Sequence, residues 1–89
     1  MVLCNNFPNG IIMTVVSNPK SLGEALCVAR KQLRLTQSQL ALAAGVGVRF
    51  IVELEGGKPT VRLEHVLRVI AVLGGELVLT GLPVASHGA

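Results

Sequence analysis

The stretch from Thr36 to Glu55 constrains the fold of this chain more than any other, because it contains a helix start, a corner and a second helix. Thr36 is followed three residues later by Gln39, which is the spacing of a capping box at a helix N-terminus. Gly45 follows an apolar run, where a helix C-terminus favours a residue that tolerates positive φ. Six apolar residues are expected to point inward: Leu40, Ala41, Ala44, Val46, Ile51 and Leu54. The pattern predicts two short helices joined by a tight turn, the second of which is built to lie in a DNA major groove.

Three strings in this region resemble the Xre/Cro-type helix-turn-helix family: Gln37-Ser38-Gln39-Leu40-Ala41, Gly45-Val46 and Glu53-Leu54-Glu55-Gly56-Gly57-Lys58-Pro59. The continuation from Leu63 to Leu82 is similar, more narrowly, to the HipB-type antitoxins. The resemblance implies a mainly α, lambda-repressor-like helix-turn-helix domain of four to five helices. It also implies a C-terminal β-strand that pairs with its copy in a second subunit, and a HipA-type kinase toxin as protein partner.

Length and composition narrow the class of protein further. The 89 residues suffice for one small domain, and 51% of them are hydrophobic, which predicts surface for a partner or a second copy. No apolar run approaches the roughly 20 residues that cross a membrane. No basic residue precedes the first apolar stretch, as one would in a signal peptide. We therefore expect a cytoplasmic protein that does not bind a membrane.

The ionisable residues favour nucleic acid and disfavour catalysis. The net charge is +3, and all eight Lys and Arg residues fall between Lys20 and Arg68, a basic centre that would attract phosphates. The chain has no Asp, and its two Cys and two His suggest neither a metal site nor a nucleophile–base set. We expect no enzyme activity, no metal and no cofactor.

The sequence before the helix-turn-helix contains a candidate strand and a predicted first helix. Ile11 to Val16 favours β structure and would join a sheet in its own chain or in another, although a leader with an apolar patch is the alternative interpretation. Ser21 and Glu24 have the spacing of a second capping box, so the first helix is expected to begin at Ser21. Its core face would contain Leu22, Ala25, Leu26, Ala29 and Leu33.

The end of the first helix and the start of the second are expected to contact the DNA backbone. Lys31 and Arg34 lie in the last turn of the first helix, where they are either solvated charges or phosphate ligands. Gln37, which matches a DNA-contacting position of the family, lies with Ser38 at a helix N-terminus whose N–H groups can hold a phosphate. The alternative for Gln37 is that it only caps its helix.

The recognition helix is expected from about Gly47 to Glu55, with a groove-facing set of Gly47, Val48, Arg49 and Val52. The family usually has polar residues at several of these positions. Valines cannot donate hydrogen bonds but can pack on thymine methyl groups, so Arg49 is left as the one strong base reader, able to bind guanine bidentately. The alternative is that this apolar face binds a protein. Phe50 is expected either to pack on the fourth helix or to flank the sugar-phosphate backbone.

The resemblance also assigns a structural ion pair, in which Arg30 holds the glutamate that closes the recognition helix, here Glu55. Lys58, in the following loop, is placed to meet a phosphate. Thr60 is expected to cap a fourth helix that ends at Gly74-Gly75, with His65 on its solvated face. The expected core stripe of that helix is Leu63, Val66, Leu67, Ile70 and Leu73.

The last predicted element is a β-prone run stopped by Pro83, with a dimerisation set of Leu77, Val78, Leu79, Thr80 and Leu82. The chain then divides into a leader (1–20, with the candidate strand 11–16), a helix-turn-helix domain (21–75), a dimerisation strand (76–83) and a tail (84–89). We expect a homodimeric repressor that binds a palindromic DNA operator, with the antitoxin role as the finer implication of the resemblance. A stand-alone regulator without a toxin, or a protein-interaction module on the same scaffold, is the alternative.

Overall fold

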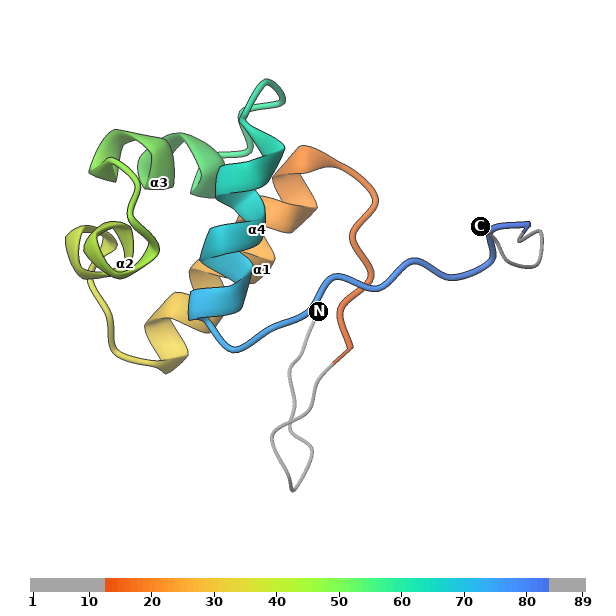
Figure 1. Ribbon diagram of the computed structural model, residues 1–89, viewed down its shortest axis with the longest axis horizontal. Helices are drawn as coiled ribbons and strands as arrows, with labels where there is room; N and C mark the ends of the chain where they lie inside the picture. Colours follow the sequence, from red (N-terminus) through yellow and green to blue (C-terminus); the bar gives the residue numbers. More distant parts are fainter. Residues whose placement is uncertain (1–12, 84–89) are drawn as a thin grey trace.

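The computed structural model describes residues 13–83, which contain four α-helices and no strand. The helices are α1 (Pro19–Gln32), α2 (Gln37–Ala44), α3 (Val48–Glu55) and α4 (Leu63–Val72). Helix α2 packs on both α3 and α4, and α3 also packs on α1 (Figure 1). The predicted mainly α architecture with a helix-turn-helix at its centre is confirmed. None of the helices in residues 13–83 is long and apolar enough to cross a membrane.

The core is built mainly from the motif itself. Leu40 of α2, Ile51 of α3 and Val69 of α4 are completely shielded from solvent. Of the residues between Thr36 and Glu55 that were expected to face inward, Val46 is half-buried against the core and the others are buried. The periodicity of this stretch therefore predicts its packing correctly.

The two local signals of the motif also form as expected. The backbone N–H of Gln39 donates to Thr36 Oγ1 at 3.0 Å, and the N–H of Thr36 donates to Gln39 Oε1 at 2.8 Å, which completes the capping box of α2. Gly45 ends α2 with φ of 71°, in the left-handed region. These contacts fix where α2 begins and where the chain turns toward α3.

Helix α1 begins earlier than the sequence predicts. Its N-cap is Asn18 rather than Ser21, and the N–H of Ser21 donates to Asn18 Oδ1 at 2.8 Å. Ser21 is instead the third residue after the N-cap. Its hydroxyl accepts a hydrogen bond from the N–H of Asn18 at 3.2 Å and donates one to the Asn18 carbonyl oxygen at 2.9 Å. Pro19 favours this earlier start, because proline lacks an N–H and suits the first helical position.

Helix α4 is rotated relative to the predicted core stripe. It begins at Leu63, with Arg62 rather than Thr60 at the N-cap and no side chain capping it. Leu63 and Leu67 are 64% and 43% exposed, whereas Val69, which was not predicted, is fully buried. The observed stripe is Val66, Val69, Ile70 and the half-buried Leu73, which is also a regular helical spacing. Leu33 is likewise exposed at the end of α1 rather than buried.

Helix α1 ends on a residue that no sequence signal marks. Arg34 has φ of 60°, and the N–H groups of Arg34 and Leu35 donate to the carbonyls of Lys31 and Arg30 at 3.0 and 3.1 Å. The other three helices end with a left-handed residue as well, but there it is a glycine: Gly45, Gly57 and Gly74. The arginine therefore occupies a conformation that costs a side-chain-bearing residue free energy.

The crossing of α1 and α3 depends on Gly23. A Cβ atom at this position would lie 2.4 Å from the carbonyl oxygen of Leu54 and 2.8 Å from that of Glu55, so nothing larger than glycine fits without movement. The backbone of α1 thus lies directly against the last turn of α3. This close approach brings Arg30 within reach of Glu55.

The segments outside the helices carry exposed apolar side chains. The chain after α4 leaves the helices (Figure 1), and four of its large apolar residues are more than half exposed: Leu77, Val78, Leu79 and Leu82. Because no strand is assigned there, the dimerisation strand and its sheet stay predictions. Met13 to Val16, the part of the candidate strand 11–16 that the structure describes, is exposed and forms no strand. Ile11, Ile12 and the tail 84–89 lie outside the described residues.

Candidate nucleic-acid interface

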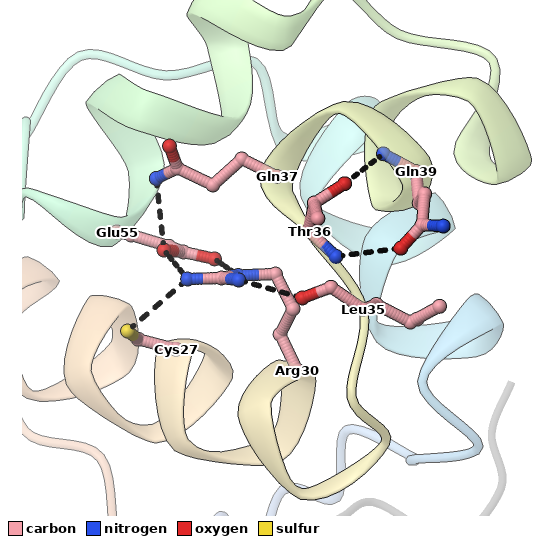
Figure 2. A network of polar contacts seen from close by, with 7 residues as sticks. All are labelled: Cys27, Arg30, Leu35, Thr36, Gln37, Gln39 and Glu55. Atoms are coloured by element: carbon pink, nitrogen blue, oxygen red, sulfur yellow. Dashed lines mark hydrogen bonds and ion pairs between the residues drawn. The ribbon is translucent and has the colours of Figure 1, made fainter.

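One carboxylate, that of Glu55, joins the ends of three helices. Arg30 of α1 donates to it through Nε at 2.7 Å and through Nη2 at 3.1 Å, so the predicted pair is present and bidentate (Figure 2). The two side chains are only 10% and 7% exposed. Arg30 Nη1 also donates to the carbonyl oxygen of Leu35 at 2.7 Å, which ties the loop between α1 and α2 to the same point.

The pKa values of this pair shift in the directions that stabilise both charges. Burial by itself raises the pKa of the Glu55 carboxyl, but the hydrogen bonds from Arg30 and Gln37 and the charge of Arg30 together hold that pKa below its ordinary value of 4.5. The hydrogen bond to Glu55 raises the pKa of Arg30 despite its burial. Both groups are therefore charged at neutral pH, and the pair is an ionic clamp between α1 and α3.

Gln37 also contributes to this clamp. Its Nε2 donates to Glu55 Oε1 at 3.1 Å, and its side chain lies across the clamp from Arg30 (Figure 2). The N-terminus of α2 is thereby held beside the C-terminus of α3. The helix itself is capped by Thr36, so capping is not the role of the Gln37 side chain. The predicted phosphate contact of Gln37 stays a prediction, together with that of the exposed Ser38 beside it.

The outward face of α3 is formed by the residues expected to enter the groove. Val48 and Val52 are 45% and 49% exposed, and the Arg49 side chain is 89% exposed. Gly47, the N-cap of α3, is exposed as well. On the opposite side of the helix, Ile51 and Leu54 are buried in the core. The structure thus anchors α3 on one side and leaves a mixed apolar and cationic surface on the other.

Sequence reasoning missed the role of Glu53 on this surface. Its carboxylate lies 3.5 Å from Arg49 Nε through Oε2 and 3.4 Å from Lys58 Nζ through Oε1. The two cations expected to contact DNA on and just after α3 are therefore held by the same anion. The four-residue spacing of Arg49 and Glu53 was a signal that could have revealed the first of these contacts.

Lys31 and Arg34 are exposed at the end of α1, and within residues 13–83 neither is in an ion pair. They lie next to the loop that Arg30 ties to the clamp. Their positive charges are available to solvent or to phosphates, and their phosphate contacts stay predictions.

Phe50 packs against α4. Its ring meets the His65 ring edge-on, with centroids 5.3 Å apart and planes at 85°. This contact selects the first of the two predicted roles of Phe50. It also corrects the expectation for His65, which is half-buried by the aromatic contact rather than fully on the solvated face.

The described residues bring no catalytic or metal-binding set together. Residues 13–83 contain no group of three His, Cys, Asp or Glu side chains that could hold a metal ion. Cys27 is a free, half-buried thiol, and Arg30 Nη2 donates to its Sγ at 3.7 Å. Cys4 lies outside the described residues.

Comparisons with known proteins agree on the class of domain. A helix-turn-helix family model (HTH_3) matches residues 28–79. An HTH-type transcriptional regulator of Sinorhizobium fredii (strain NBRC 101917 / NGR234), y4mF, is 46% identical over 59 residues, which cover 66% of this chain and 78% of that protein. Two solved structures, a HipA-HipB-O2-O3 complex and a HipB-O4 20mer complex, each contain a chain that is 22% identical with a TM-score of 0.72. Each alignment covers 80% of this chain and 100% of that chain, and at this identity the likeness is one of fold.

Proposed function

We propose that this chain, which belongs to the Xre-type helix-turn-helix family of DNA-binding transcriptional regulators, is a homodimeric repressor that recognises a palindromic operator. We further propose that it is the antitoxin of a HipBA-like toxin–antitoxin operon. The observation that carries the repressor role is the exposed face of α3, formed by Val48, Arg49 and Val52 on a helix that is clamped from behind.

Base recognition in this proposal combines one polar reader with two apolar ones. Arg49, which is almost fully exposed, donates two hydrogen bonds to the O6 and N7 atoms of a guanine. Val48 and Val52 lie one turn apart on the same side of α3 and pack on thymine methyl groups. This combination predicts an operator half-site in which a G·C pair lies next to thymines.

Contacts to the sugar-phosphate backbone set the register of the helix in the groove. The N-terminus of α2, with Gln37 and Ser38, offers backbone N–H groups to one phosphate. Lys31 and Arg34 at the end of α1, and Lys58 after α3, add positive charge on either side. Because Glu55 holds the start of α2 beside the end of α3, these contacts would act as one rigid unit.

A second copy of the chain completes the proposed repressor. The residues after α4 expose four large apolar side chains in a domain of this small size, which favours their burial against a partner. Pairing of the two Leu77–Leu82 segments about a twofold axis would place two α3 helices in successive major grooves, about 34 Å apart. The palindrome of the operator would follow from that symmetry.

The antitoxin role is supported by the fold alone. The chain has the fold of the HipB chains in the solved complexes, one of which also contains HipA. A regulator without a toxin is the alternative, and it requires only what the name of y4mF gives, an HTH-type transcriptional regulator. Coelution of the purified chain with the product of an adjacent kinase gene would support the antitoxin role, and an operon without such a gene would leave the stand-alone regulator.

The repressor role can be tested by fluorescence anisotropy with the duplex upstream of the chain's own gene and a scrambled duplex of the same composition. The wild type is compared with Arg49→Ala and with Arg68→Ala, a matched control on α4 whose arginine also pairs with a glutamate four residues away. We expect tighter binding of the upstream duplex, a loss of about 1–3 kcal/mol with Arg49→Ala, and little change with the control.

Two other outcomes would contradict the proposal in different ways. Equal, strongly salt-dependent binding of both duplexes would mean that only phosphates attract the chain. No binding of either duplex at low salt would make α3 a protein-binding face, since Val48 and Val52 then need a different apolar partner.

A further inference from the structure

Glu53 is the one acidic residue among the groups proposed to contact DNA. It lies on α3 one turn after Arg49, and its side chain is 33% exposed. Its two carboxylate oxygens face different cations, Oε2 toward Arg49 and Oε1 toward Lys58. A carboxylate that approaches the phosphates of DNA is repelled by them, so its presence here needs an explanation beyond the stability of α3.

We propose that Glu53 is a specificity-determining residue, which weakens binding to nonspecific DNA while it leaves Arg49 able to read its guanine. This inference rests on the proposed function, because it requires that α3 enters the major groove. It assigns to Glu53 a part of the difference between binding of the operator and binding of other sequences, in addition to the base contacts of Arg49, Val48 and Val52.

The geometry of the Arg49 pair is compatible with base reading. The contact to Glu53 is made by Nε, and none of the hydrogen bonds within residues 13–83 uses either Nη group of Arg49. The two Nη groups can together donate to the O6 and N7 atoms of a guanine while Nε stays beside the carboxylate. In the operator complex Glu53 therefore restrains the guanidinium plane, and the pair does not need to break.

The Lys58 pair, unlike the Arg49 pair, opens on any DNA. Lys58 is an ammonium group in the loop after α3, where its proposed partner is a phosphate rather than a base. On nonspecific DNA, phosphate contacts supply nearly all of the binding free energy. Lys58 leaves Glu53 to reach a phosphate on either kind of DNA, whereas Arg49 leaves it only on nonspecific DNA, where it also moves to a phosphate. On nonspecific DNA the carboxylate is then left without a cation and is repelled by the phosphates. The penalty falls mainly on sequences that offer Arg49 no guanine.

Glu53→Gln is the decisive variant, because it removes the charge and keeps the length of the side chain. Glu64→Gln is its matched control: Glu64 pairs with Arg68 four residues away on α4, at 3.3 Å, so the control removes an equal charge and a similar pair from outside the proposed interface. Glu53→Asp restores the negative charge at position 53. Thermal unfolding monitored by circular dichroism verifies that each variant is folded.

The experiment first lets the wild-type chain select its preferred duplex from a random-sequence library. Affinities for that duplex and for a scrambled one are then measured by anisotropy over a series of salt concentrations. With Glu53→Gln we expect the scrambled duplex to bind about three- to tenfold more tightly, and the selected duplex to change by less than about threefold. The salt dependence for the scrambled duplex should steepen by about one unit of log–log slope.

The controls separate this inference from an effect of net charge. We expect Glu64→Gln to strengthen binding of both duplexes by the same small factor, and Glu53→Asp to keep the wild-type ratio of affinities. An equal gain for both duplexes with Glu53→Gln, or a ratio no different from that of Glu64→Gln, would overturn the role of Glu53 alone. If the wild type selects no duplex, the repressor proposal fails, and the role of Glu53 fails with it.

Discussion

Helix α3 carries two glutamates, two positions apart, that the structure uses in opposite ways. Glu55 is buried and held by a bidentate arginine and a glutamine, at distances from 2.7 to 3.1 Å. Glu53 is partly exposed and lies 3.4 to 3.5 Å from two exposed cations on the outer surface. Because residues two apart lie about 200° apart around a helix, one carboxylate faces α1 and the other faces solvent. The same side chain is therefore a clamp in one position and an exposed charge in the other.

The difference teaches that burial, rather than the number of partners, decides what such a charge does for the fold. A buried pair need not add net stability, but removal of one partner leaves the other charge without compensation in a low-dielectric environment. An exposed pair is screened by water, so its presence stabilises the fold only slightly and its removal costs little stability. Variants of the two glutamates should consequently separate loss of the fold from loss of DNA discrimination.

The largest effect is expected for Glu55→Gln. This change leaves Arg30 buried without its counter-charge, and we expect a loss of about 3–5 kcal/mol in the free energy of unfolding, measured by urea denaturation. The double variant Arg30→Met/Glu55→Leu should recover much of that loss, because no buried charge remains. A loss below about 1 kcal/mol for the single variant would show that the clamp is open to water.

The next effect tests the close approach that makes the clamp possible. Gly23→Ala places a methyl group against the carbonyl oxygens of Leu54 and Glu55, so α1 must move away from α3. We expect a loss of about 1–3 kcal/mol in urea denaturation. Gly47→Ala is the control, since a Cβ there would meet nothing within 4 Å and φ is −75°. Equal losses for the two variants would contradict the tight helix crossing.

A smaller effect should appear in the pH dependence of stability. The pKa of Glu55 is lower in the folded chain than its ordinary value of 4.5, so the folded state binds this proton less readily than the unfolded state. The stability that Glu55 contributes is then fully present above pH 4.5 and is lost as the pH falls through the lowered folded pKa. Thermal melts over this acid range should lose part of their pH dependence in Glu55→Gln, whereas Glu64→Gln should keep the Glu55 contribution. If Glu55→Gln shows the same pH dependence of the melting temperature as the wild type in the acid range, the lowered pKa of Glu55 is contradicted.

How far the sequence predicts this molecule depends on the range over which each signal acts. The capping box of α2 and the turn at Gly45 are made within a few residues, so the local pattern was sufficient. The Arg30–Glu55 pair spans 25 positions and came from resemblance to a family, not from spacing. The Arg49–Glu53 contact had a local signal, but its sharing with Lys58 depends on the path of the loop after α3.

The errors have equally specific causes. Two capping patterns compete at the start of α1, and the asparagine before a proline prevails over the later serine. The rotation of α4 is set by packing against α2, and its leucines offered two nearly equivalent apolar stripes. The left-handed Arg34 has no sequence signal, because arginine is not a residue that favours that conformation. In each case a local pattern permits several structures and tertiary contacts select one.

The smallest expected effect completes the comparison of the two glutamates. Glu53→Gln removes two exposed pairs from the same helix on which Glu55→Gln opens the clamp, and we expect the free energy of unfolding to change by no more than about 0.5 kcal/mol. Urea denaturation of the two variants side by side measures this contrast under identical conditions. A loss comparable to that of Glu55→Gln would mean that Glu53 supports the fold of α3, and any change in DNA selectivity would then follow from a distorted helix. If the free energy of unfolding hardly changes in Glu53→Gln, then α3 stays intact without this charge. Any change in DNA selectivity would then come from the charge of Glu53 itself.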